Sequence, residues 1–63
     1  MKVKILKDDS VFNDCWLVYE TFLGSMDLVK VCWSFDSAWQ HARSLNPDTI
    51  KFYTTKKAMT DDK

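Results

Sequence analysis

The segment 14–33 most constrains what this chain can fold into, because it reads as two apolar strands joined by one tight turn. Gly24 is the only glycine in the chain. With Ser25 it suits a two-residue type II′ turn, whose first position requires a positive φ. We therefore predict a β-hairpin in which residues 14–23 pair with residues 26–33. A two-residue turn also defines the register of the two strands.

The predicted register places Leu23 opposite Met26 and Trp16 opposite Trp33. Because side chains of a strand alternate between its two faces, each face of the hairpin has a defined composition. One face is expected to carry Trp16, Val18, Val29, Val31 and Trp33. The other is expected to carry Cys15, Leu17, Tyr19, Leu28, Lys30 and Cys32. The first face can form part of the core, and the second is too apolar for ordinary solvent-exposed surface.

Two further strands are predicted from residue type and alternation. Residues 2–7 alternate between apolar and mostly basic side chains, which is typical of a strand with one buried face. Residues 49–55 are rich in β-branched and aromatic side chains, which favour strands.

Between the hairpin and residues 49–55, the spacing of apolar residues changes from two residues to three or four. Residues 34–45 predict a helix with Ser34 as its N-cap. Its apolar stripe consists of Phe35, Ala38, Trp39, Ala42 and Leu45. Asn46 precedes Pro47 and should end the helix, because a residue before proline avoids the α conformation.

The order of elements predicts an α+β fold, a small single-layer, mostly antiparallel sheet (β-β-β-α-β) with one helix packed on one face. A right-handed crossover through the helix makes the fourth strand parallel to the third. The fourth strand can lie beside the first strand or beside the third, and the sequence does not choose. With 63 residues, the chain is expected to form one domain, 1–63, with residues 56–63 as a frayed polar tail.

Composition and charge argue against several classes of protein. Nine basic and nine acidic residues give a formal net charge of zero, unlike the positive excess of proteins that coat nucleic acid. No apolar stretch is long enough for a membrane span or a signal peptide, so we expect a cytoplasmic protein without membrane association. In that compartment Cys15 and Cys32 should stay reduced.

No combination of residues in the sequence predicts catalysis or metal binding. His41, the only histidine, lies off the apolar stripe and has no predicted partner group. There is no C-x-x-C pair, and one glycine cannot build a glycine-rich phosphate loop. We therefore expect a protein that is not an enzyme, with no cofactor, no metal and no small-molecule substrate.

The second apolar face of the hairpin instead predicts a protein-interaction module. A partner protein would bind that open sheet face and an edge strand. The expected contacts are Leu17, Tyr19, Leu28, Lys30, Lys51 and Tyr53. A homodimer through the same face also fits the pattern. Alternatively, Val11-Phe12 or the C-terminal tail could fold over this face.

Size suggests a setting for such a module. Many bacterial and bacteriophage accessory proteins are this small, and we expect a protein of that kind, which binds a larger protein and modulates or inhibits it. A second hypothesis is single-stranded nucleic-acid binding by Tyr19, Tyr53 and nearby lysines, since rings stack on bases while lysines neutralise phosphates. It is the weaker hypothesis, because this face has no arginine and no aromatic-glycine motif.

Overall fold

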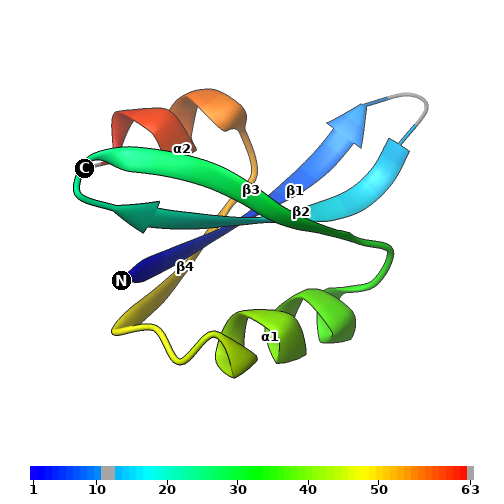
Figure 1. Ribbon diagram of the computed structural model, residues 1–63. Coiled ribbons are helices and arrows are strands. Elements are labelled where there is room, and N and C mark those ends of the chain that lie inside the picture. Colours follow the sequence, from blue (N-terminus) through cyan, green and yellow to red (C-terminus); the bar gives the residue numbers. More distant parts are fainter. Residues whose placement is uncertain (11–12, 63) are drawn as a thin grey trace.

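The computed structural model describes residues 1–10 and 13–62, which form a four-stranded mixed sheet with a helix on each face (Figure 1). The strands are β1 (Lys2–Ser10), β2 (Asn13–Phe22), β3 (Ser25–Cys32) and β4 (Thr49–Tyr53). The helices are α1 (Phe35–Ser44) and α2 (Lys56–Asp61). The predicted α+β fold, with a helix packed on one face of a mostly antiparallel sheet, is confirmed, and α2 adds a short helix on the other face.

The strand order is β3-β2-β1-β4, which answers the question that the sequence left open. β4 lies beside β1 and parallel to it, with Val3 opposite Ile50. β1 is consequently an inner strand, and Val3 and Ile5 are fully buried. β3 is left at the edge of the sheet.

The first strand is longer than predicted. β1 and β2 pair as far as Ser10 and Asn13, so the polar run Asp8-Asp9-Ser10 continues the strand beyond the predicted residues 2–7. Pairing with a neighbouring strand outweighs the weak local preference of such residues for turns. Val11-Phe12, which was considered as a cover for the apolar face, lies outside the described residues.

The main core lies between the sheet and α1. It consists of Val3, Ile5, Val18, Cys32, Ala38 and Ala42. The side chain of Ser34 accepts a hydrogen bond of 3.2 Å from the backbone N–H of Ser37, as expected of an N-cap. The predicted helix is thus confirmed. Its two buried positions are alanines, which allow the helix backbone to approach the sheet closely.

The larger residues of the predicted stripe lie at the border of this core. The Phe35 and Trp39 rings pack against the Phe52 ring, with centroid distances of 5.3 and 5.8 Å. Trp39 and Leu45 are half-buried, and Phe35 is exposed. The stripe faces the sheet as predicted, but its aromatic residues cover β4 instead of filling the centre.

Residues 56–61 form α2, so the prediction of a frayed tail is wrong. The Thr55 side chain caps this helix by accepting a hydrogen bond of 3.1 Å from the Ala58 N–H. Met59 is fully buried, and α2 packs against β1 and β4. A six-residue helix with one buried apolar residue has no periodicity that could reveal it, and only the Thr55 cap was visible in the sequence.

Candidate protein-interaction surface

The turn of the second hairpin consists of Leu23 and Gly24, one residue earlier than predicted. Phe22 pairs with Ser25, and the two turn residues have φ values of 51° and 87°. Positive φ at both positions defines a type I′ turn, whose twist matches that of the strands. The Ser25 hydroxyl donates a hydrogen bond of 3.0 Å to the Phe22 carbonyl oxygen. The predicted Gly24-Ser25 turn is therefore wrong.

A β-bulge changes the register again along β3. Tyr19 pairs with Leu28, but Val18 pairs with Lys30, so Val29 is an extra residue in β3. Trp16 then lies opposite Cys32 instead of the predicted Trp33. From Lys30 to Cys32, the side chains of β3 therefore lie on the opposite faces of the sheet from those predicted. For this half of the strand, the prediction is wrong.

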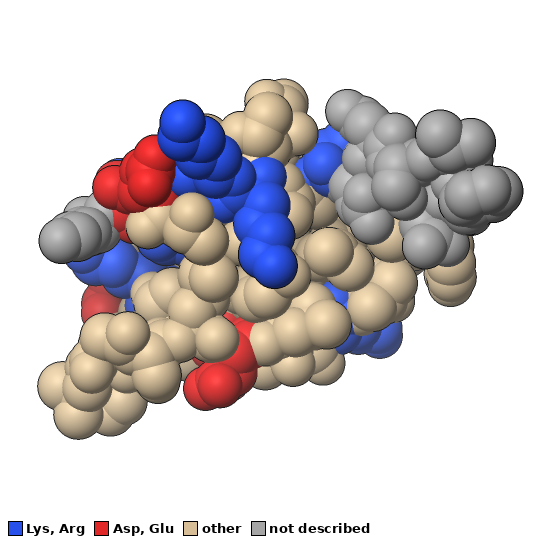
Figure 2. All heavy atoms as spheres, turned by 90° about the horizontal axis from the view of Figure 1, so that it is seen from above, with Lys and Arg blue, Asp and Glu red and all other residues tan. Residues whose placement is uncertain are grey.

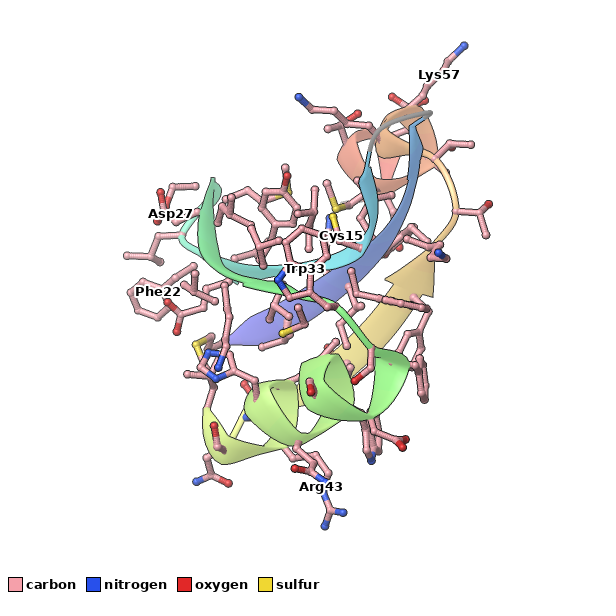
Figure 3. All side chains as sticks on the ribbon, turned by 90° about the vertical axis from the view of Figure 1, so that its right-hand side faces the viewer. Cys15, Phe22, Asp27, Trp33, Arg43 and Lys57 are labelled. Atoms are coloured by element: carbon pink, nitrogen blue, oxygen red, sulfur yellow. The ribbon has the colours of Figure 1, made fainter. Side chains whose placement is uncertain are left out.

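The exchange separates the two cysteines. Cys32 is buried in the core between the sheet and α1, whereas Val31 lies opposite Leu17 on the α2 side. Cys15 is also buried, and it lies on the α2 side of the sheet (Figure 3). Both thiols are free and lie on opposite faces, so they do not share a site.

The predicted contact residues form two groups and one outlier. Leu17, Tyr19 and Leu28 share the α2 side, because Leu17 and Tyr19 alternate with buried Val18 and Tyr19 pairs with Leu28. Lys30 pairs with Val18 and therefore lies on the α1 side of the sheet. The prediction that Lys30 shares their face is therefore wrong.

The second group consists of Lys51 and Tyr53 on β4, whose polar atoms contact Asp62. The Asp62 carboxylate accepts a hydrogen bond from the Tyr53 hydroxyl and another, of 3.2 Å, from the Lys51 ammonium group. These hydrogen bonds lower the pKa of Asp62. Burial, followed by the hydrogen bond and charge of Asp62, raises the pKa of Tyr53 to about 12. Lys51 and Tyr53 do lie on the same side of the sheet as Tyr19 and Leu28, because they pair with Lys4 and Leu6, which pair with Tyr19 and Leu17. They are separated from Leu28 by two strands, however, and help to hold the end of α2.

The same contacts bear on the nucleic-acid hypothesis. Tyr53 and Lys51 contact a carboxylate, and Lys4 is almost fully buried beneath α2. An open platform would need these rings and ammonium groups to be available to bases and phosphates. No observation in the structure favours this hypothesis, and we do not propose it.

A larger apolar surface surrounds the end and the edge of the second hairpin. We call it the hairpin surface; it extends around the edge of the sheet, with Leu28 and Val31 on the α2 side and Phe22 on the α1 side, and consists of Phe22, Leu23, Leu28, Val29, Val31 and Trp33. Leu23 is 91% exposed, Trp33 71% and Phe22 62%. Figure 3 shows Phe22 at the hairpin end, extending away from the sheet on the same side as Asp27. Of these residues, only Leu28 is among the contacts predicted from the sequence.

The hairpin surface flanks an open strand edge. β3 pairs with β2 along one edge, and within the described residues no strand pairs with its other edge. Uncharged residues make up much of the molecular face seen from the α2 side (Figure 2). An unpaired edge with exposed apolar side chains is a site where an added strand can bind.

An open groove adjoins this surface. It has a volume of about 560 Å³ and lies where the hairpin end approaches the N-terminus and α2. Phe22, Leu23 and Met26 line one part, and Lys2 and Asp62 line another. A partner that contacts Leu23 therefore also meets a concave surface with both apolar and charged groups.

Leu23 is the least expected residue of this surface. In a type I′ turn, Asn, Asp or Gly is preferred at this position, because positive φ is unfavourable for other side chains. By contrast, Asn46 has a φ of 55° after α1, where asparagine is well tolerated. Leu23 is both strained and almost fully exposed, so its side chain contributes little to the fold. The only sign of this residue in the sequence is a leucine directly before the only glycine of the chain.

Other kinds of site find little support in the described structure. Across residues 1–10 and 13–62, no three His, Cys, Asp or Glu side chains are grouped so as to hold a metal ion. Neither of the helices described is long and apolar enough to cross a membrane. Comparison with known proteins finds no matching family model, no matching curated protein and no matching solved structure.

Proposed function

We propose that this protein is a non-enzymatic interaction module that binds a larger protein through the hairpin surface. The observation that carries the proposal is Leu23, which is 91% exposed with a φ of 51°. A strained residue whose side chain does not stabilise the fold is best explained by a contact outside the chain. Asparagine at this position would relieve the strain and remove an exposed apolar side chain.

The partner's chemistry follows from what surrounds Leu23. Phe22 and Leu28 supply apolar contacts near the hairpin end, and the free edge of β3 supplies backbone N–H and C=O groups. A complementary protein segment would be extended, with apolar side chains beside its backbone. Large apolar side chains such as Phe22 and Leu23 would be the principal contacts.

Stoichiometric binding of this kind would change the partner's activity by occupying part of its surface. We therefore propose a cytoplasmic accessory protein, bacterial or from a bacteriophage, that modulates or inhibits the larger protein. The partner would contact the residues of the hairpin surface, together with the predicted contacts Leu17 and Tyr19 on the neighbouring strand β2.

The test uses a substitution for which stability and binding should change in opposite directions. Leu23→Asn should raise the free energy of unfolding while it removes binding. The tagged full chain is used to capture proteins from a lysate of its source organism, with Lys57→Ala, an exposed change on α2, as the matched control. The proposal is supported if one protein is enriched by the wild type and by Lys57→Ala but lost with Leu23→Asn. Equal capture by all three chains, or no specific capture, contradicts it.

A further inference from the structure

The edge strand β3 has an unusual distribution of charge. Its eight residues include only two charged side chains, Asp27 and Lys30, both exposed. They lie symmetrically about the middle of the strand, which falls between Leu28 and Val29. An arrangement with one charge of each sign, equally far from the centre, is complementary to itself when the strand is reversed.

The β-bulge places these two charges on the same side of the sheet. Asp27 pairs with Glu20 and Lys30 pairs with Val18. Glu20 and Val18 are two residues apart on β2 and so face the same way. In a regular strand, residues three apart such as 27 and 30 would face opposite ways, and the extra residue Val29 removes this difference.

We propose that two copies of this chain pair antiparallel along β3, with Asp27 of each copy opposite Lys30 of the other. This register uses the whole strand, because Ser25 of one copy then lies opposite Cys32 of the second. It rests on the proposed interaction role of the hairpin surface: a second copy and the extended segment of the larger protein would bind the free edge alternately, while Leu23 lies beyond that edge in both cases. The paired strands join the two sheets into one continuous sheet.

Alternative registers are less favourable. Moving the second copy by three residues in either direction places Asp27 opposite Asp27 or Lys30 opposite Lys30. Like charges directly opposite on paired strands are destabilising, whereas opposite charges stabilise the pair. Such shifts also leave three residues at each end without a partner. Charge and length therefore favour the same register.

The apolar side chains agree with this pairing. Met26 pairs with Thr21 and Val31 with Leu17, which places both on the α2 side of the sheet. In the proposed register, Met26 of one copy lies opposite Val31 of the other on that side. Within the described chain, α2 packs on β1 and β4, at the opposite edge of the sheet from the new interface. The two α2 helices therefore do not obstruct the interface.

The test measures the mass of the purified full chain by sedimentation equilibrium over a wide concentration range. We expect a concentration-dependent dimer for the wild type. Asp27→Lys alone and Lys30→Asp alone should each weaken it roughly tenfold or more, because both symmetry-related pairs become repulsive. The double variant should restore dimerisation, since each pair is then reversed but intact.

Mixing the two single variants gives the sharpest result. Asp27→Lys and Lys30→Asp chains should form a mixed dimer, because every opposing pair then joins unlike charges. As controls, Asp61→Lys and Lys57→Asp carry the same charge changes on exposed positions of α2 and leave β3 unchanged, so each alone and their mixture should dimerise as the wild type does. Circular dichroism confirms that each variant is folded. A monomeric wild type, or α2 control variants that lose the dimer as the β3 variants do, overturns the proposal.

This test can fail independently of the proposed function. The dimer is measured on the chain alone, whereas the function is measured by capture of a different protein. Leu23 lies outside β3, so Leu23→Asn should leave the dimer intact while it removes partner capture. A monomeric chain that still captures a partner through Leu23 would refute only the pairing of β3.

Discussion

The ammonium group of Lys4 donates a hydrogen bond of 3.0 Å to the backbone carbonyl oxygen of Met59, joining the centre of the sheet to the last turn of α2. The same group also donates to the carbonyl oxygen of Asp62. Carbonyl groups at the end of a helix lack partners within the helix and attract a positive charge. Lys4 therefore acts as a cap for a helix that is distant in sequence.

Lys4→Met should release α2 while preserving most of the apolar volume of the side chain. We expect a loss of about 1–3 kcal/mol in the free energy of unfolding, because a buried charged donor with two acceptors is removed. Urea denaturation measures the loss, and hydrogen exchange should show faster exchange of α2 amides. Lys2→Met is the matched control, since Lys2 is exposed on the same strand. Equal effects of the two substitutions would contradict the capping role of Lys4.

The contact between Tyr53 and Asp62 makes stability depend on pH at both extremes. The pKa of Asp62 is lowered, so its contribution to stability is present above its ordinary value of 3.8 and is lost as the pH falls through the folded-state value. The pKa of Tyr53 is raised from 10.0 to about 12, so its contribution is complete below pH 10.0 and is lost as the pH rises to about 12.

Tyrosinate absorbance tests this dependence. In a Tyr19→Phe background, Tyr53 is the only tyrosine, and its titration midpoint should lie near 12. Asp62→Asn should lower the midpoint but leave it above 10.0, because burial is the larger cause of the shift. Circular dichroism shows whether the sheet is intact at each pH. A midpoint unaffected by Asp62→Asn would mean that this contact does not form in solution.

The core should be more sensitive to Ile5 than to Trp39. Ile5 is fully buried in the inner strand β1, so Ile5→Ala should destabilise the protein by about 2–5 kcal/mol. A domain of this length has a total stability on the order of 3–9 kcal/mol, so this variant should be largely unfolded under mild denaturing conditions. Trp39 is half-buried against Phe52, and Trp39→Ala should cost less than the about 3–5 kcal/mol of a buried tryptophan. Thermal melts measure the loss of stability in both variants. A larger loss for Trp39→Ala than for Ile5→Ala would contradict the packing of α1 described above.

Gly24→Ala should destabilise the hairpin through backbone strain alone. Gly24 has a φ of 87°, and an added Cβ would meet no atom within 4 Å. We expect a loss of about 1–2 kcal/mol from the unfavourable conformation, with no steric clash. Ser25→Gly is a useful comparison, because it removes the hydroxyl that donates to the Phe22 carbonyl oxygen while leaving the turn residues unchanged. No loss of stability in Gly24→Ala would indicate a turn of another type.

The error at the hairpin illustrates how far local patterns can be taken. A single glycine marks the turn correctly but is compatible with either the first position of a II′ turn or the second position of a I′ turn. The prediction is the type II′ turn, whereas the structure has the type I′ turn, with Leu23 at its first position and Gly24 at its second. Asparagine before the glycine would have indicated a type I′ turn, and leucine did not.

Only part of the candidate site could be predicted from the local sequence. The presence of an apolar hairpin was recognised, and Leu17, Tyr19 and Leu28 do share one side of it. Lys30 was assigned to the wrong face because a bulge has no clear sequence signal. Lys51 and Tyr53 were assigned to the site because the helix that brings Asp62 to them was not predicted.

The sequence by itself determined the four strands, the helix α1 and the α+β class, because alternation, helical periodicity and the Ser34 cap are properties of neighbouring residues. Only the tertiary structure decided the strand order, the register of β3 and the docking of α2. Each depends on contacts between residues distant in the chain, such as Lys4 with Met59, whose energies do not appear in any local pattern. The free edge that could accept a second copy is a consequence of those distant contacts.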